Sequence, residues 1–470
     1  MKRRSFFKKV GSVAVMATLL PKASAFSRIS FPNESDLKIV VHGGKCYFQD
    51  KWQVLDIGVN EKGKLKIGSP NSLKAAERMD ATNKIVSPGF IDILADNTAN
   101  PERTYKLFEK YKVSDGVATA LQMHGGSPDC ATYYKTFNVL PHYINFGAST
   151  SVMRIRYASS NLADRKKRVE KCLEEGSLGV SHSIEYQPTP FEEIVEYARL
   201  AKKYDRTFFL HLRYSSTEQE LEGVEEAIRI AKDSGARVHI DHLHSTGGTF
   251  HMREALVKIK NANLQGLRIT CCVYPYSYWA TYLHSKRFDE GWQQRYGLTY
   301  NDLRLVGTGE RLTPKSFKRY RELKKLAAVP EGTLPLDKTV DLALKEDFCM
   351  IGSDGGIEYE PHANSHPRGA GCFATSIRHA LDIGMPLEKI LEKITTLPRS
   401  LILPAMKERG VLSDGAWADL TVFDSSKVNG KATVTNPNQF SEGIEMVMVN
   451  GMVAYRGGKV EAVSGVAIRN

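Results

Sequence analysis

Residues 207–248 read TFFLHLRYSSTEQELEGVEEAIRIAKDSGARVHIDHLHSTGG and contain two apolar segments with histidine at their ends. Apolar residues recur at helical spacing over 216–234, which predicts an amphipathic helix between two strands. A strand–helix–strand unit predicts two parallel strands in one sheet, so His211 and His242 should lie at the same edge. Neutral imidazole is the commonest zinc ligand, and this pair indicates a metal site. The alternative is that each histidine is an ordinary core or surface residue.

The rest of the middle of the chain repeats this alternation of strands and helices. We expect strands at 85–95, 118–123, 143–146, 179–183, 207–212, 237–242, 268–273 and 348–353. Eight strands with intervening helices predict an α/β fold of the (β/α)₈ TIM-barrel type, with chemistry where the strands end. The seventh connection is unusually long, with an insertion at about 284–338. Long loops of this kind are usually functional, and a lid is the role we consider for it.

The two ends of the chain have a different pattern. Short strands alternate with Gly, Lys and Asn turns in both regions, and Asn450-Gly451 is a hairpin signal. We therefore expect one small β-sandwich domain, built from 27–86 and 406–470, beside a barrel domain at 87–405. A chain of 470 residues is long enough for both.

The first 25 residues resemble an export signal of the twin-arginine type. A basic segment with Arg3 and Arg4 precedes an apolar run at 10–20 and the small residues Ala23-Ser24-Ala25. The run is too short to span a membrane, so we expect removal of the signal, a periplasmic protein and no stable membrane span afterwards. A general export signal or an uncut anchor are the alternatives.

Charge and cysteine content argue against two classes of protein, nucleic-acid-binding proteins and disulfide scaffolds. The signal carries six basic residues and no acidic ones, so its removal halves the formal net charge from +12 to +6. The remaining basic residues do not cluster with aromatic ones, and we expect no nucleic-acid binding. Seven irregularly spaced cysteines without a CxxC pair argue against a disulfide scaffold.

Several short stretches, in order, resemble the amidohydrolase superfamily and most closely the N-acyl-D-amino-acid deacylases. They are VSPGFID at 86–92, GSLGVS at 176–181, IEYQP at 184–188, VYPY at 273–276, GSDG at 352–355 and HPR at 366–368. The resemblance covers nearly all of the chain after the signal. It implies a metal-dependent amide hydrolase that removes the acyl group from N-acyl-(D-)amino acids.

The chain departs from this family at its first metal subsite. The family has His-x-His after the first strand, whereas this chain has Leu94 and Asp96. Leucine cannot bind a metal. The family's cysteine ligand after the second strand aligns with Gly125, and His124 is the possible substitute. The resemblance implies one divalent ion, most simply zinc, held by His211, His242 and either Glu185 or His124.

The resemblance also implies a role for Asp354, which matches the family's catalytic aspartate. As general base it would take a proton from water and then pass it to the leaving amine. Arg368 resembles the family's carboxylate-binding arginine, which suits a small substrate with a free carboxylate. Further candidates for substrate binding are Tyr274, Tyr276, His244 and Arg213, for each of which a structural role is equally open.

Two other functions stay open at this point. The missing His-x-His pair is typical of a catalytically degenerate relative that binds a ligand or partner. A hydrolase of a cyclic amide or lactone is the third reading. The aromatic strip Tyr278, Trp279 and Tyr282 fits an acyl pocket or packing beneath a lid.

Overall fold

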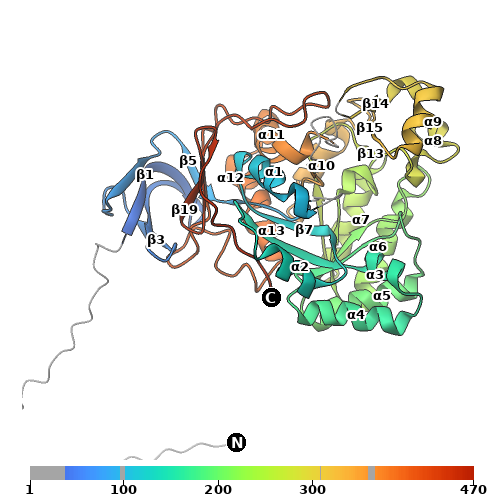
Figure 1. Ribbon diagram of the computed structural model, residues 1–470, viewed down its shortest axis with the longest axis horizontal. Helices are drawn as coiled ribbons and strands as arrows, with labels where there is room; N and C mark the ends of the chain where they lie inside the picture. The colour runs from blue at the N-terminus through green and yellow to red at the C-terminus, as the bar shows by residue number, and fades with distance from the viewer. Residues whose placement is uncertain (1–36, 96–100, 307, 358–365) are drawn as a thin grey trace, which may run out of the picture.

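The computed structural model describes residues 37–95, 101–306, 308–357 and 366–470. The predicted signal at 1–25 and Asp96 lie outside the described residues. Two bodies of secondary structure lie side by side, a larger α/β barrel and a smaller all-β domain (Figure 1).

Eight parallel strands form the barrel and confirm the predicted fold class. In order, they are β6 (Phe90–Asp92), β7 (Val117–Ser127), β8 (Asn145–Ser151), β9 (Gly179–Ser183), β10 (Thr207–His211), β11 (Arg237–Ile240), β12 (Arg268–Val273) and β16 (Cys349–Ile351). A parallel bridge between Ala95 and Gly355 lies beyond the ends of β6 and β16, so the sheet nearly closes.

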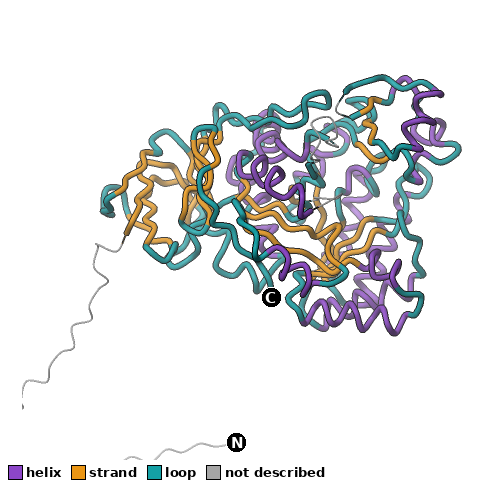
Figure 2. Tube along the Cα trace, viewed as in Figure 1, coloured by secondary structure: helices purple, strands orange, loops and turns teal. Residues whose placement is uncertain are grey.

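Helices cover the outside of this sheet (Figure 2). They are α1 (Pro101–Ser114), α2 (Cys130–Phe137), α3 (Val152–Ala158), α4 (Leu162–Glu174), α5 (Phe191–Lys203), α6 (Glu220–Ser234), α7 (Met252–Leu264), α11 (Arg368–Asp382), α12 (Leu387–Ile394) and α13 (Thr396–Ser400). Phe208 and Leu210 belong to the large buried cluster beneath the helices, whereas Phe209 belongs to a separate one with Leu121 and Met350. This alternation fills the barrel interior with side chains.

Strands from both ends of the chain form the second domain, as predicted. The sheet contains β1 (Leu37–Phe48), β2 (Lys51–Asn60), β3 (Leu65–Gly68), β4 (Glu77–Asp80), β5 (Ile85–Pro88), β17 (Leu420–Phe423), β18 (Ile444–Val449), β19 (Met452–Arg456) and β20 (Lys459–Val460). These strands are hydrogen-bonded into one sheet. A bridge between Lys64 and Trp417 links its two arms, so the sheet curls around a shared core.

The predicted strand at 85–95 is two strands in the structure. β5 pairs with β17 in the small domain, and β6 pairs with β7 in the barrel. Gly89 stands between them, where a Cβ atom would lie 2.3 Å from Cβ of Ala118. Only glycine permits this close approach, which lets one continuous segment pass from one sheet into the other.

The long seventh connection folds into structure of its own. It contains a three-stranded sheet of β13 (Ala280–Tyr282), β14 (Arg304–Leu305) and β15 (Leu326–Ala328), with helices α8 (Trp292–Tyr296), α9 (Pro314–Glu322) and α10 (Val340–Leu344). Short 3₁₀ turns occur at Lys286–Phe288, Tyr300–Asp302 and Leu336–Lys338, and another follows β11 at Leu243–Ser245. Trp292 and Phe317 stack with ring centroids 5.6 Å apart, which gives this insertion an aromatic core.

All seven cysteines are buried thiols, in keeping with the expectation of no disulfide framework. Among the described helices, none has the length and apolar character needed to cross a bilayer.

Candidate metal centre and active site

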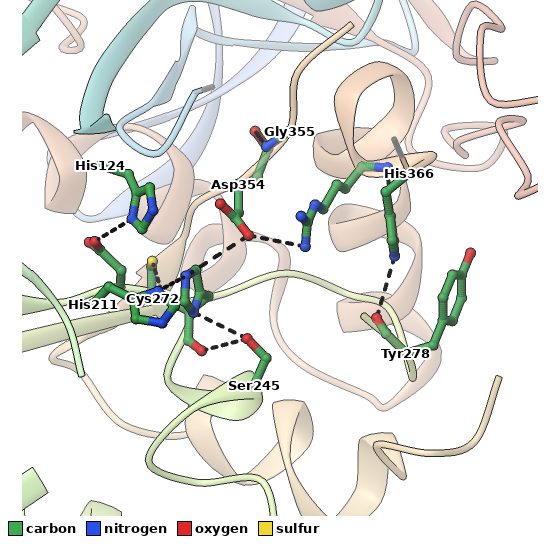
Figure 3. A network of polar contacts seen from close by, with 12 residues as sticks. His124, His211, Ser245, Cys272, Tyr278, Asp354, Gly355 and His366 are labelled. Atoms are coloured by element: carbon green, nitrogen blue, oxygen red, sulfur yellow. Dashed lines mark hydrogen bonds and ion pairs between the residues drawn. The ribbon is translucent and has the colours of Figure 1, made fainter. Parts of the chain in front are cut away.

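Four candidate side chains line one cavity at the carboxyl end of the barrel strands. The cavity has a volume of about 480 Å³, and His124, His211, His242 and Asp354 all contribute to its wall. His211 ends β10, and His124 lies within β7 (Figure 3). Two of the four residues have left-handed backbones, with φ of 29° at His242 and 49° at Asp354. Such conformations are uncommon for non-glycine residues and concentrate at functional sites.

The three histidines form a compact cluster. One ring nitrogen from each of His124, His211 and His242 lies within 4.8 Å of the other two. Nδ1 of His211 is 3.1 Å from Nε2 of His242. Nitrogens bound tetrahedrally at about 2.0–2.1 Å from one zinc ion would lie roughly 3.3 Å apart. The spacing therefore fits a shared cation.

Each of these imidazoles has a partner on its far side. Nδ1 of His124 is 2.8 Å from a carboxylate oxygen of Asp241, and Nε2 of His211 is 2.7 Å from Glu185. Nδ1 of His242 is 3.1 Å from the hydroxyl of Ser245. Donation of these protons outward leaves one nitrogen of each ring to face the cluster as a lone-pair donor.

Burial lowers the pKa of two of these imidazoles, those of His211 and His242, and so favours their neutral form. It is the main cause that lowers the pKa of His211, although Glu185 acts in the opposite direction. Burial lowers the pKa of His242 much further, together with the neighbouring histidines and the guanidinium groups of Arg287 and Arg368. A neutral imidazole is the form that binds a metal, so this donor set fits a divalent ion.

Glu185 lies behind the cluster. One of its oxygens contacts Nε2 of His211 and a guanidinium nitrogen of Arg287, at 2.7 and 3.1 Å, and the other accepts a hydrogen bond from Ser215 at 2.7 Å. Burial alone would raise the pKa of Glu185, but Arg287, His211 and Ser215 together lower it to about 2. Of the two alternatives for the third ligand, the geometry favours His124, and Glu185 orients His211.

Asp354 stands between the cluster and an arginine. Its Oδ2 atom is 3.9 Å from Nε2 of His242 and 3.0 Å from a guanidinium nitrogen of Arg368. The Arg368 guanidinium also lies over the ring of Tyr274, 4.9 Å from its centroid. Both Arg368 and Tyr274 line the cavity, where a substrate can reach them.

The structure places the other three predicted substrate-binding residues away from the cavity wall that the described residues form. Arg213 turns toward α6 and forms hydrogen bonds with Glu226, the shortest at 2.7 Å. His244 packs edge-on against the ring of Tyr274, with centroids 4.0 Å apart. Tyr276 packs in the same way against His366 at 5.0 Å. Ion pairing and aromatic packing therefore account for these side chains.

The missing first subsite has a clear structural counterpart. Leu94 is fully buried and packs into the barrel interior together with Ile93. An apolar side chain thus occupies the position at which the resemblance expects a histidine ligand. The histidine set that the described residues supply is His124, His211 and His242.

Sequence reasoning missed the residues that orient the ligands. Asp241 and Ser245 lie within the histidine-bearing stretch, and their places beside His242 could have marked them. Arg287 carried no signal, because it comes from the insertion and reaches Glu185 only through the tertiary fold. Of the predicted aromatic strip, Trp279 and Tyr282 line the cavity, whereas Tyr278 stacks on His366.

The opposite walls of the cavity differ in origin. The seventh connection supplies Trp279, Thr281, Tyr282 and Leu326. The barrel side supplies residues of α3, namely Met153, Arg154 and Tyr157. The seventh connection also supplies His284, Ser285 and Arg287, so its wall combines aromatic and aliphatic side chains with polar ones. Its aromatic part suits an organic group next to the polar centre.

Comparison with known proteins gives the same picture. No family model matches the chain. N-acyl-D-glutamate deacylase of Alcaligenes xylosoxydans xylosoxydans is 26% identical over 456 residues, which cover 85% of this chain and 89% of that protein. D-aminoacylase of the same organism is 24% identical over 445 residues, which cover 85% and 90%.

A solved structure shares the fold. N-acyl-D-glutamate deacylase from Bordetella bronchiseptica, complexed with zinc and a phosphonate inhibitor, superposes with a TM-score of 0.79. The match has 24% identity and covers 93% of this chain and all of that one. With the barrel and the histidine-lined cavity, these relatives support an amidohydrolase superfamily enzyme close to the D-aminoacylases.

Proposed function

We propose that this protein is a metal-dependent hydrolase that removes the acyl group from N-acyl-D-amino acids. The observation that carries the proposal is the meeting of three imidazoles and the Asp354 carboxylate in one cavity. The relatives named as N-acyl-D-glutamate deacylase and D-aminoacylase support this substrate class and its chirality.

His124, His211 and His242 would hold the ion, and zinc is our proposal for its identity. A bound divalent ion of this kind polarises the scissile carbonyl and lowers the pKa of water to about 7. The outward partners Asp241, Glu185 and Ser245 fix the ring orientations. This arrangement leaves the protein's own acid–base work to Asp354.

Asp354 moves the proton. One carboxylate oxygen takes a proton from the attacking water, and the carboxyl group then delivers it to the nitrogen of the leaving amine. Its pairing with Arg368 at 3.0 Å holds the carboxylate in the cavity, directed toward His242. The same position of Asp354 serves both steps, because after the attack the water oxygen and the leaving nitrogen are bonded to the same carbon.

Arg368 is the proposed group that binds the substrate carboxylate. Guanidinium has five donors in a planar fork that matches the geometry of a carboxylate, and Arg368 lines the cavity. The aromatic wall from the insertion would then accommodate the acyl group. The substrate is thus a small molecule with one carboxylate near the metal centre and an apolar acyl end.

The catalytic proposal is tested with N-acetyl-D- and N-acetyl-L-amino acids as substrates. We expect amine release from the D series, and loss of at least about a hundredfold in kcat on Asp354→Asn, as for removal of a general base. Metal content should be unchanged in Asp354→Asn. Full activity in that variant would contradict the role of Asp354.

Leu94 favours a second candidate, a degenerate relative that binds a ligand without turnover. A protein of that kind would hold N-acetyl-D-amino acids in equilibrium dialysis and release no amine. It would also contain less than about 0.2 equivalents of metal per chain and gain none with added zinc. An intact zinc site would instead fill, because such sites bind the ion tightly. The survival of the histidine cluster favours the hydrolase.

Periplasmic location is also a proposal. It is supported by the twin arginines, the short apolar run and the small residues at 23–25. Fractionation of cells that produce the full chain, compared with Arg3→Lys/Arg4→Lys, tests it. Recovery of the double variant in the same periplasmic fraction would exclude the twin-arginine route.

A further inference from the structure

The first and last strands of the barrel meet at a seam with little backbone pairing among the described residues. The sheet order ends with β6 on one side and β16 on the other. Within the described residues, the backbone bridge between their extensions is that of Ala95 with Gly355. Asp354 precedes Gly355, so the proposed general base stands at this seam.

The side chain of Asp92 spans this seam. Its Oδ1 atom accepts a hydrogen bond from the backbone N–H of Ser353 at 3.1 Å, and its Oδ2 atom accepts one from the Ser353 hydroxyl at 2.5 Å. Oδ1 also accepts from the N–H of Leu94 at 3.1 Å. The Asp92 carboxylate on β6 thereby accepts from the backbone N–H of Ser353 a hydrogen bond that a carbonyl group of a neighbouring strand would otherwise accept.

A buried lysine completes the arrangement. Nζ of Lys112, from α1, lies 2.8 Å from Oδ2 of Asp92 and donates to the Ser353 hydroxyl at 2.9 Å. The side chains of Lys112 and Asp92 are both 0% exposed. Removal of two charges from water costs several kcal/mol for each ion, so such a pair is weak evidence for stability alone.

The hydroxyl of Ser353 is fully used. It donates to Asp92 and accepts from Lys112 and from the backbone N–H of Gly355 at 3.1 Å. One donor and two acceptors are the whole capacity of a hydroxyl. The backbone on both sides of Asp354 is therefore tied to one buried centre, while Asp354 itself has the left-handed φ of 49°.

We propose that Asp92, Lys112 and Ser353 are positioning residues for Asp354. They form a buried ionic clamp that closes the barrel seam and holds Asp354 in the conformation that directs its carboxylate toward His242. None of the three lines the cavity, so they act through the backbone and not on substrate. The inference rests on the proposed role of Asp354 as general base.

Ser353→Ala is the sharpest test, because it removes all three contacts of the hydroxyl, with Asp92, Lys112 and the Gly355 N–H. It leaves the Asp92–Lys112 pair and the backbone N–H contact with Asp92 in place. A catalytic group misplaced by about 1 Å can lose a hundredfold in rate. We expect kcat to fall at least about tenfold, with KM and metal content within about threefold of the wild type. Ser177→Ala is the matched control, since Ser177 is also buried and has two hydroxyl contacts outside the cavity.

Hydrogen–deuterium exchange supplies a readout that needs no turnover. Amides at 352–357 should exchange faster in Ser353→Ala, and their exchange should be unchanged in Ser177→Ala. Lys112→Met is the second variant, and it should show the same local increase. If the wild type hydrolyses no N-acyl amino acid, the proposed function fails, yet exchange still decides the positioning claim.

The outcomes separate cleanly. Faster local exchange with reduced kcat and an ordinary KM supports the clamp. Unchanged exchange at 352–357 in both variants overturns it. A kcat within about twofold of the wild type in Ser353→Ala also overturns it, because the hydroxyl would then have no part in holding the base.

Discussion

At the scale of residues, the centre depends on what stands behind each imidazole. Asp241, Glu185 and Ser245 each contact the outer nitrogen of one histidine, so the inner nitrogens are the ones left to face a shared cation. Glu185 is the clearest case, because its carboxylate is already held by Arg287, His211 and Ser215. The account therefore distinguishes residues that would bind the metal from residues that orient its ligands.

This distinction predicts different losses of metal affinity. His124→Ala removes a ligand and should reduce zinc affinity beyond measurement in chelator competition. Glu185→Gln removes an orienting carboxylate, which typically costs 10–100-fold in affinity while the ion still binds. The reverse ranking would place Glu185 among the ligands and His124 outside them.

Arg368 predicts discrimination between charged and neutral substrates. In Arg368→Met, kcat/KM for an N-acyl-D-amino acid should fall at least about tenfold more than kcat/KM for the same compound as its C-terminal amide. The comparison isolates the carboxylate contact, because any disturbance of Asp354 affects both compounds equally. Equal losses would show that the substrate carboxylate binds elsewhere.

At the scale of elements, the predicted and observed positions agree for site residues that lie at the end of a single strand. The expected strand ends placed His211, His242 and Asp354 at the same rim, as found. Arg287 could not be foreseen, since its position depends on how the insertion packs against the barrel. The predicted role of Arg213 in substrate binding was wrong for a similar reason. Arg213 lies two residues after His211, but its side chain turns outward and pairs with Glu226 of α6.

The packing at the junction between β16 and α11 predicts that a methyl group added at Gly355 would destabilise the protein. A Cβ at Gly355 would lie 2.6 Å from the backbone oxygen of Arg368. Gly355→Ala should therefore destabilise the protein by about 1–3 kcal/mol, the usual cost of overpacking, and should lower kcat because α11 carries Arg368.

Gly223→Ala is the control for that measurement. Its Cβ would have ordinary contacts, the nearest at 3.5 Å, within α6. Alanine in place of a helical glycine stabilises by up to about 1 kcal/mol, so the thermal midpoint should rise. A Gly355→Ala variant as stable as the wild type would contradict the close packing of α11 on the strand end.

At the scale of the whole molecule, buried histidines outside the metal cluster couple stability to pH. Burial lowers the pKa of His182 to about 3 and that of His239 to about 4, from the ordinary histidine value of 6.5. Below pH 6.5 the unfolded chain therefore takes up protons that the folded chain does not. The free energy of unfolding should fall as pH drops from about 6.5 to about 4, by about 1.4 kcal/mol per pH unit for each histidine.

Thermal unfolding at pH 7.5 and pH 5.0 checks this dependence. The drop in unfolding free energy between the two should be smaller in His239→Gln than in the wild type. Equal drops would show that His239 binds its proton in the folded state as readily as in the unfolded one.

The whole architecture could be predicted because local patterns set it: strand–helix alternation in the middle and short strands at both ends. The site was only partly predictable. The proposed ligands lie on strands or directly after one, but the residues that orient them come from turns, a loop and an insertion, and packing brings them together. The split of the expected first strand at Gly89 has the same origin, since close contact with Ala118 decides it.

Anomalous diffraction at the zinc edge, from crystals of the protein grown with zinc, tests the central claim most directly. The account predicts one strong peak in the cavity, about 2.0–2.2 Å from one ring nitrogen each of His124, His211 and His242. No peak in the cavity, or a peak that these three imidazoles do not bind, would contradict it.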